Sequence, residues 1–216
     1  MKLFLSSAGI RTQELAEALS SLIGKPLEDI SIAVINEASA VEPGDKTWLL
    51  NEMNDLRKYV GGEIDFVNLL ALNANEVKAR VAFADVIYVV GGNPDYLLYL
   101  YEKTGFARSL RDTLLNEKAY IGSSAGSMVL GRRGSTNEYQ SYYGGDRDFG
   151  VADYLGVVDF VVKPHFGSSS LPRNHVDILL KASAVEQQSI YAIRDDQAII
   201  IDNETVSFVG GDVYKV

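Results

Sequence analysis

The letters GSSAG at positions 122–126 place Ser124 two residues from a glycine on either side, directly after an apolar run. A serine on a sharp strand-to-helix turn is exposed for attack, and the flanking glycines let strand and helix approach closely. Ser123 and Ser127 lack glycine at both of these positions. We therefore expect Ser124 to be a nucleophile, and the alternative is an unreactive tight turn.

A serine nucleophile needs a general base, and the chain contains two histidines. His165 comes just after the apolar run 157–163. Parallel α/β sheets place their ligands at the carboxyl ends of strands, so we expect His165 on the same rim as Ser124. His175 falls near the start of a polar helical segment and is the weaker candidate.

A carboxylate should orient the histidine, and the residues alone leave several candidates open. The chain order serine, histidine, acid selects one of two adjacent aspartates at a strand end. The order serine, acid, histidine selects a residue of the Gly- and Tyr-rich loop 131–150. The candidates are Asp195 and Asp196 for the first order, and Glu138, Asp146 and Asp148 for the second. Each could equally be an ordinary turn residue.

Two backbone amides are needed to stabilise the oxyanion of acyl transfer. One is expected from Ala125, the residue after the nucleophile. The second is expected from Gly91 or Gly92, which follow the apolar run 86–90 and open a helical segment. The alternative is that these glycines only form the turn that connects a strand to a helix. No G-x-G-x-x-G, P-loop or H-E-x-x-H motif is present, so we expect no cofactor and no metal.

The elements that must position these residues alternate between strand and helix. Apolar, β-branched runs predict strands buried on both faces, and helical periodicity predicts the segments between them. Thr12 and Gly24 are typical caps for the first helix. Strands are predicted at 2–7, 30–35, 63–69, 86–90, 119–123 and 157–163. Helices are predicted at 12–24, 46–59, 75–83, 94–104, 107–116 and 172–184.

Four short segments near the C-terminus predict an antiparallel run at one edge of the sheet. They are 190–194, 198–202, 205–209 and 212–216. The pattern as a whole predicts an α/β fold, a three-layer doubly wound and mostly parallel sheet with a short antiparallel edge. No linker or repeat is evident, so residues 1–216 are interpreted as one domain.

Composition narrows the classes of partner. The net charge of −9 argues against nucleic acid, and no apolar run is long enough to cross a membrane. The absence of cysteine excludes disulfides, thiolate metal sites and a cysteine nucleophile, and fits a reducing compartment. The N-terminal apolar run is too short for a signal peptide. We expect a cytoplasmic protein, monomeric or homodimeric, with no nucleic-acid or membrane partner.

Four segments together resemble the peptidase E family of serine peptidases, to which cyanophycinases are related. They are VVGGNPDYLL at 89–98, YIGSSAGSM at 120–128, KPHFG at 163–167 and AIRDDQAI at 192–199. The similarity runs over nearly the whole chain in the same order. It implies a doubly wound α/β fold related in its core to class I glutamine amidotransferases. It also implies a Ser-His-Glu triad and cleavage of dipeptides with N-terminal aspartate.

By position, the resemblance makes Ser124 the nucleophile and His165 the general base. It places the acid on Asp195, with Asp196 as the nearest alternative. It also implies an oxyanion hole made of the Gly92 and Ala125 amides.

The resemblance also implies substrate contacts. Glu138 looks like the family's acidic residue after the nucleophile, which binds the substrate α-amino group or supports the histidine. Arg173 is the candidate reader of an acidic side chain, with a surface role as the alternative. Three positions depart from the family: Asp195 replaces glutamate, Pro94 replaces threonine, and Asp177 stands where a second arginine is expected. The last departure weighs against aspartate specificity.

The function expected from the sequence is therefore a serine exopeptidase or dipeptidase with a Ser-His-Asp/Glu triad, acting on peptides with N-terminal aspartate. One alternative is a cyanophycinase-like hydrolase of amide or isopeptide bonds. Another is a catalytically silent binding module of the same fold.

Overall fold

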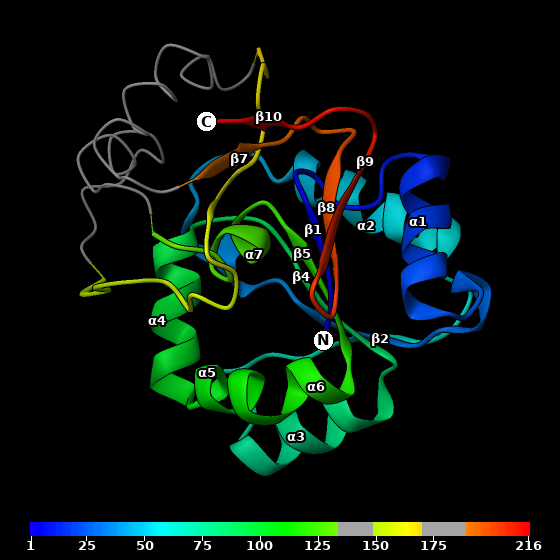
Figure 1. The fold of residues 1–216 in the computed structure, drawn as a ribbon. Coiled ribbons are helices and arrows are strands. Elements are labelled where there is room, and N and C mark those ends of the chain that lie inside the picture. The colour runs from blue at the N-terminus through cyan, green and yellow to red at the C-terminus, as the bar shows by residue number, and fades with distance from the viewer. Residues whose placement is uncertain (134–148, 170–188) are drawn as a thin grey trace.

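The computed structural model describes residues 1–133, 149–169 and 189–216 (Figure 1). Several predicted features lie outside the described residues. They are Glu138, Asp146, Asp148, Arg173, His175 and Asp177, together with the predicted helix 172–184 and most of the loop 131–150.

A seven-stranded sheet of order β3-β2-β4-β5-β1-β8-β9 forms the centre of the protein. The first five strands in this order are parallel, and β8 and β9 form an antiparallel edge. The strands are β1 Lys2–Ser6, β2 Ile32–Ile35, β3 Ile64–Phe66, β4 Val86–Val89, β5 Ala119–Ser123, β8 Ala198–Asp202 and β9 Thr205–Val209. The predicted doubly wound, mostly parallel sheet is therefore confirmed.

The helices lie close to their predicted positions. They are α1 Gln13–Ile23, α2 Thr47–Tyr59, α3 Ala74–Phe83, α4 Pro94–Thr104, α5 Phe106–Ser109, α6 Leu115–Glu117 and α7 Ala125–Met128. The predicted helix 107–116 is divided, because a π-helical turn at Leu110–Leu114 separates α5 from α6. Both predicted caps of α1 are present: Thr12 Oγ1 accepts from the Leu15 N–H at 3.2 Å, and Gly24 has φ 79°.

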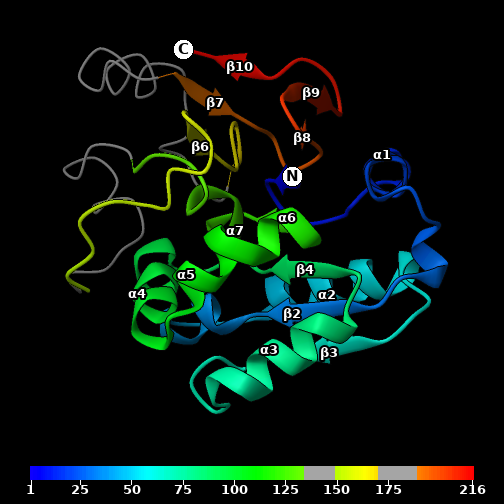
Figure 2. The ribbon, with the colours of Figure 1, turned by 60° about the horizontal axis from the view of Figure 1, so that its bottom comes forward.

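Helices cover both faces of the sheet because neighbouring strand residues point to opposite sides. On β1, Phe4 packs into an apolar cluster with residues of α1 and α2. Leu3 and Leu5 pack into a second cluster with residues of α3, α4 and α7. Figure 2 shows α3 in front of β2 and α2 behind it. The result is the expected three layers. Among the described residues, no helix is long and apolar enough to cross a membrane.

A second, three-stranded sheet of order β10-β7-β6 corrects the prediction for the C-terminal run. Its strands are β6 Val161–Lys163, β7 Ile190–Ala192 and β10 Tyr214–Lys215, with β6 and β7 parallel. Only β8 and β9 join the central sheet. The reason is tertiary: apolar residues of β6 and β7 form their own small cluster. A local alternation pattern predicts a strand but does not select its partner.

Candidate active site

The site lies where three neighbouring parallel strands end. In the register of the sheet, Ser6 of β1 is opposite Ser123 of β5, and Val89 of β4 is opposite Gly122. The residues that follow these strands therefore meet at one rim of the sheet. This is the position at which open α/β sheets bind their ligands.

Ser124 occupies a strained turn between β5 and α7. Its φ of 48° and ψ of −109° are a conformation that most residues avoid. A Cβ on Gly122 would lie 2.6 Å from the backbone of Gly126, and a Cβ on Gly126 would lie 2.2 Å from the Val89 carbonyl oxygen. Both glycines are therefore needed for the close contact of strand and helix, as the sequence predicts.

The neighbouring serines have other surroundings. Ser127 is fully buried, and its hydroxyl donates to the Ser6 carbonyl at 2.8 Å. Ser123 is also fully buried. Ser124 is the member of this group whose hydroxyl meets a histidine.

His165 connects Ser124 to a carboxylate. Its Nε2 lies 3.0 Å from Ser124 Oγ, and its Nδ1 lies 2.7 Å from Asp195 Oδ1. The tautomer with a proton on Nδ1 donates to the carboxylate and leaves Nε2 to accept from the serine. The residue follows β6 in a left-handed conformation, with φ 60°. This arrangement has the geometry required for proton transfer from serine to imidazole.

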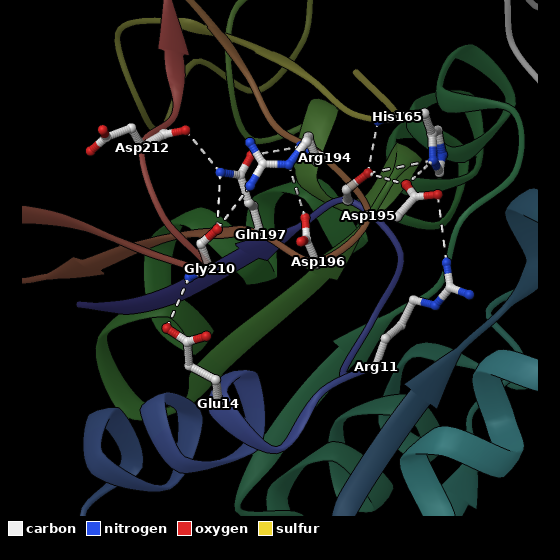
Figure 3. A network of polar contacts seen from close by, with 10 residues as sticks. Arg11, Glu14, His165, Arg194, Asp195, Asp196, Gln197, Gly210 and Asp212 are labelled. Carbon is white, nitrogen blue, oxygen red and sulfur yellow. Dashed lines mark hydrogen bonds and ion pairs between the residues drawn. The ribbon is translucent and has the colours of Figure 1, made fainter. Parts of the chain in front are cut away.

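The two adjacent aspartates point in different directions, which separates the alternatives left open by the sequence (Figure 3). Asp196 is exposed, and its carboxylate accepts from Arg194 Nε at 3.2 Å. Asp195 instead contacts His165, and its second oxygen lies 3.5 Å from Arg11 Nη1. Among the described acidic candidates, Asp195 is therefore the one in position to orient His165. The aspartate side chain is shorter than the glutamate that the resemblance implies, but it reaches the imidazole.

The surroundings of Asp195 favour its ionised form. Burial raises the pKa of this carboxyl, but the hydrogen bond and charge of His165, the Ser7 hydroxyl and the Arg11 guanidinium together outweigh burial. The net effect is a pKa below the ordinary value for aspartate. The carboxylate is thus an acceptor at neutral pH, as an orienting residue must be.

Ser7 is a functional candidate that the sequence analysis missed. Its hydroxyl donates to Asp195 Oδ1 at 2.7 Å and accepts the His165 backbone N–H at 2.7 Å. It therefore ties together the two segments that carry the histidine and the acid. The signal was available, because Ser7 ends the first predicted strand and the rule that places His165 on the rim applies equally to it.

Gln197 fixes the turn that carries Asp195 (Figure 3). Its side-chain oxygen accepts the Arg194 N–H at 2.9 Å. Its side-chain nitrogen donates to the carbonyls of Gly210 at 3.2 Å and Asp212 at 2.9 Å. No local pattern in the sequence indicates this role, because the partners come from a separate loop.

The backbone N–H groups of Gly92 and Ala125, which the resemblance implies as the oxyanion hole, donate to no acceptor among the described residues. The same is true of Gly91, which lies beside Ser124 in the cleft lining. Ala125 is the first residue of α7, where helical N–H groups have no intrahelical partner. Gly92 has φ 136°, and a Cβ there would lie 2.2 Å from the Ala38 carbonyl carbon. The unusual Pro94 fits as the first residue of α4, a position that favours proline.

The serine and histidine open into a cleft of about 430 Å³. Its floor includes Gly91, Gly92 and Ser123, and one wall is a face of α2. The part of the chain that the structure describes contains no group of three or more histidine, aspartate or glutamate side chains that could hold a metal ion.

A buried carboxylate, Glu52, lies at the base of this wall and was also missed by the sequence analysis. It accepts from the Tyr88 hydroxyl at 2.8 Å. Burial raises the pKa of Glu52. Neighbouring hydroxyls and the charges of His165 and Arg11 lower this pKa, but by less than burial raises it, so the net pKa is above the ordinary value for glutamate. Burial also raises the pKa of Tyr88 well above its usual value.

Comparison with known proteins gives a consistent assignment. The chain matches Peptidase family S51 over residues 3–209. It is 28% identical over 181 residues to the uncharacterized peptidase PM1590 of Pasteurella multocida, covering 83% of this chain and 84% of the relative. It is 28% identical over 137 residues to peptidase E of Shewanella sp. strain MR-4, covering 59% of this chain and 54% of that protein.

Solved structures agree on the fold. A candidate peptidase E from Listeria monocytogenes superposes with a TM-score of 0.78 at 23% identity, covering 96% of each chain. A peptidase from an acI-B1 actinobacterium superposes with a TM-score of 0.69 at 19% identity, covering 100% of this chain and 93% of the other. Because the family match spans nearly the entire sequence, the chain belongs to peptidase family S51 and is a peptidase.

Proposed function

We propose that this peptidase is a serine exopeptidase that hydrolyses short peptides, with Ser124, His165 and Asp195 as its catalytic residues. The proposal rests on the geometry around His165. Ser124 Oγ lies 3.0 Å from its Nε2, and Asp195 Oδ1 lies 2.7 Å from its Nδ1. A silent binding module would have no need to retain this arrangement.

In the proposed reaction, Ser124 Oγ attacks the carbonyl carbon of the scissile bond as its proton passes to His165 Nε2. The Gly92 and Ala125 N–H groups donate to the resulting oxyanion. When the carbon–nitrogen bond breaks, the imidazolium gives its proton to the leaving amine. Water then attacks the acyl-serine with His165 as base again, which releases the acid and restores the serine. Asp195 stays ionised and holds the ring in place.

N-terminal aspartate is the substrate feature that the resemblance to peptidase E supports. In that proposal Arg173 contacts the acidic side chain and Glu138 the α-amino group. The described part of the cleft adds one arginine, Arg11, and its guanidinium is already paired with Asp195. The cysteine-free composition supports a cytoplasmic location for such an enzyme.

The second candidate is a cyanophycinase-like hydrolase of amide or isopeptide bonds. The same three catalytic residues would serve it. Support comes from the carboxylates of Glu42, Glu52 and Asp55, which line the cleft and suit a cationic substrate.

A dipeptide panel tests the proposed function. The panel contains Asp-X dipeptides, neutral dipeptides and β-aspartyl-arginine, each incubated with wild type and with Ser124→Ala. We expect the wild type to release free amino acids from at least one class and the variant to release none. Equal rates for the two proteins on every substrate would contradict the proposal. Faster turnover of β-aspartyl-arginine than of Asp-X would favour the second candidate.

A further inference from the structure

One face of α2 forms a wall of the cleft beside the proposed nucleophile. Trp48, Glu52 and Asp55 all line the cleft. Their spacing of four and then three residues places them on the same side of the helix, one turn apart. We name these three residues the α2 wall. The wall therefore presents an aromatic ring and the Asp55 carboxylate to whatever the cleft binds, while Glu52 is buried and bonded to Tyr88.

Most carboxylates in the cleft already have partners. Asp195 is bonded to His165, and Glu52 accepts from Tyr88. Glu42 interacts with the side chain of Asn93 and with the charge of Lys46. These carboxylates therefore already interact with side chains of the protein.

Asp55 differs from the other carboxylates. It is half-buried and lines the cleft, yet it has no hydrogen bond or ion pair to any residue in the described ranges. A partly desolvated carboxylate is best satisfied by a cationic hydrogen-bond donor. This side chain is thus available to a ligand.

No positively charged side chain of the described cleft lining pairs with the negative charge of Asp55. Arg11 is the arginine in the described lining, and it bridges to Asp195 at 3.5 Å. The Asp55 carboxylate, which has no partner among the described residues, therefore indicates a ligand with a positively charged hydrogen-bond donor.

We propose that the α2 wall binds a lysine or arginine side chain of the peptide substrate, with Asp55 as the specificity-determining residue. The Asp55 carboxylate accepts from the ammonium or guanidinium group. The half-exposed Trp48 ring adds a cation–π contact. This inference rests on the proposed peptidase function and adds a lysine or arginine side chain to the features of its substrate.

The test compares lysine with norleucine, which has a similar chain without the charge. Rates are measured for Lys-Ala against Nle-Ala and for Ala-Lys against Ala-Nle. For at least one pair, we expect wild type to prefer lysine in kcat/KM by about tenfold or more. Asp55→Asn should reduce that ratio several-fold. Asp55→Lys should invert it and favour the corresponding aspartate peptide.

Glu28→Gln is the matched control, because Glu28 is exposed, remote from the cleft lining and loses the same unit of charge. Its lysine-to-norleucine ratio should equal that of wild type. Equal rates for lysine and norleucine in both pairs would overturn the inference. So would a ratio that Asp55→Asn leaves unchanged, and in both cases the peptidase proposal would stand.

A binding measurement separates the two proposals if no peptide is cleaved. Calorimetry on Ser124→Ala protein gives the dissociation constants of the same dipeptides without turnover. Tighter binding of the lysine peptide, lost in the double variant with Asp55→Asn, would support the inference even if the peptidase proposal failed. Equal affinity for lysine and norleucine peptides would overturn it.

Discussion

His165 Nδ1 lies 2.7 Å from Asp195 Oδ1, although the two residues are 30 positions apart and follow strands of the small sheet. His165 comes two residues after β6, and Asp195 lies between β7 and β8. The pairing of β6 with β7 therefore brings base and acid together. Ser124 is contributed separately by the central sheet.

The first prediction concerns the choice of acid. Asp195→Asn should reduce kcat by about 10³- to 10⁴-fold, because the amide favours the wrong imidazole tautomer. Asp196→Asn is the matched control one residue away, and it should retain kcat within about twofold because this exposed side chain pairs only with Arg194 in the described structure. Steady-state kinetics on any cleaved dipeptide measures both. A large loss in Asp196→Asn with little loss in Asp195→Asn would contradict Asp195 as the carboxylate that orients His165.

The second prediction concerns Ser7 as a positioning residue. Ser7→Ala removes the hydroxyl that links Asp195 to the His165 backbone. We expect kcat to fall about tenfold while KM changes little, since the hydroxyl does not form the proposed oxyanion hole. Ser21→Ala, on the exposed side of α1, is the control and should match wild type. If Ser7→Ala lowers only the melting temperature and leaves kcat unchanged, its role is structural.

The third prediction uses the raised pKa of Glu52. Because burial raises this pKa in the folded state, the native protein binds more protons than the unfolded chain between the unfolded and folded pKa values. The contribution of Glu52 to the free energy of unfolding therefore declines as pH rises through that window. Glu52→Gln abolishes the effect. We therefore expect the free energy of unfolding of Glu52→Gln, minus that of wild type, to increase as the pH rises from 4.

Urea unfolding at a series of pH values measures this difference. Glu28→Gln, which removes an exposed carboxylate, should show no comparable trend. A difference between Glu52→Gln and wild type that stays flat or declines with rising pH would contradict the assignment.

The fourth prediction concerns the glycine that lets α7 approach β4. In Gly126→Ala, the new methyl group would lie 2.2 Å from the Val89 carbonyl oxygen. Displacement of that backbone should cost about 3 kcal/mol or more in the free energy of unfolding. Gly24→Ala is the comparison, because its φ is 79° but no atom lies within 4 Å, and its cost should be about 1–2 kcal/mol. Equal losses in the two variants would argue against the proposed close contact.

Local signals predicted most of the elements that place the site. The glycines around Ser124, the caps of α1 and the apolar runs of the parallel strands each have a direct physical cause in the sequence. His165 was expected on the rim because strand ends gather there. The residues alone left the choice between Asp195 and Asp196 open, since adjacent residues differ only in the direction of their side chains, and it was the resemblance to peptidase E that favoured Asp195.

Features that depend on distant partners were missed. The small sheet pairs β6 with β7 and β10, and neither strand reveals its partner. Glu52 is spaced like an ordinary helical residue, and its burial follows from contact with Tyr88 of β4. Gln197 is conspicuous only once Gly210 and Asp212 are brought beside it.

Labelling with a fluorophosphonate probe, followed by mass spectrometry, tests the central claim most directly. The proposed triad predicts one adduct in folded wild-type protein, located on Ser124 and absent from Ser124→Ala. His165→Ala should slow labelling strongly, because the base that activates the serine is removed. Absence of label from folded wild type, or an adduct that persists in Ser124→Ala, would contradict Ser124 as the nucleophile.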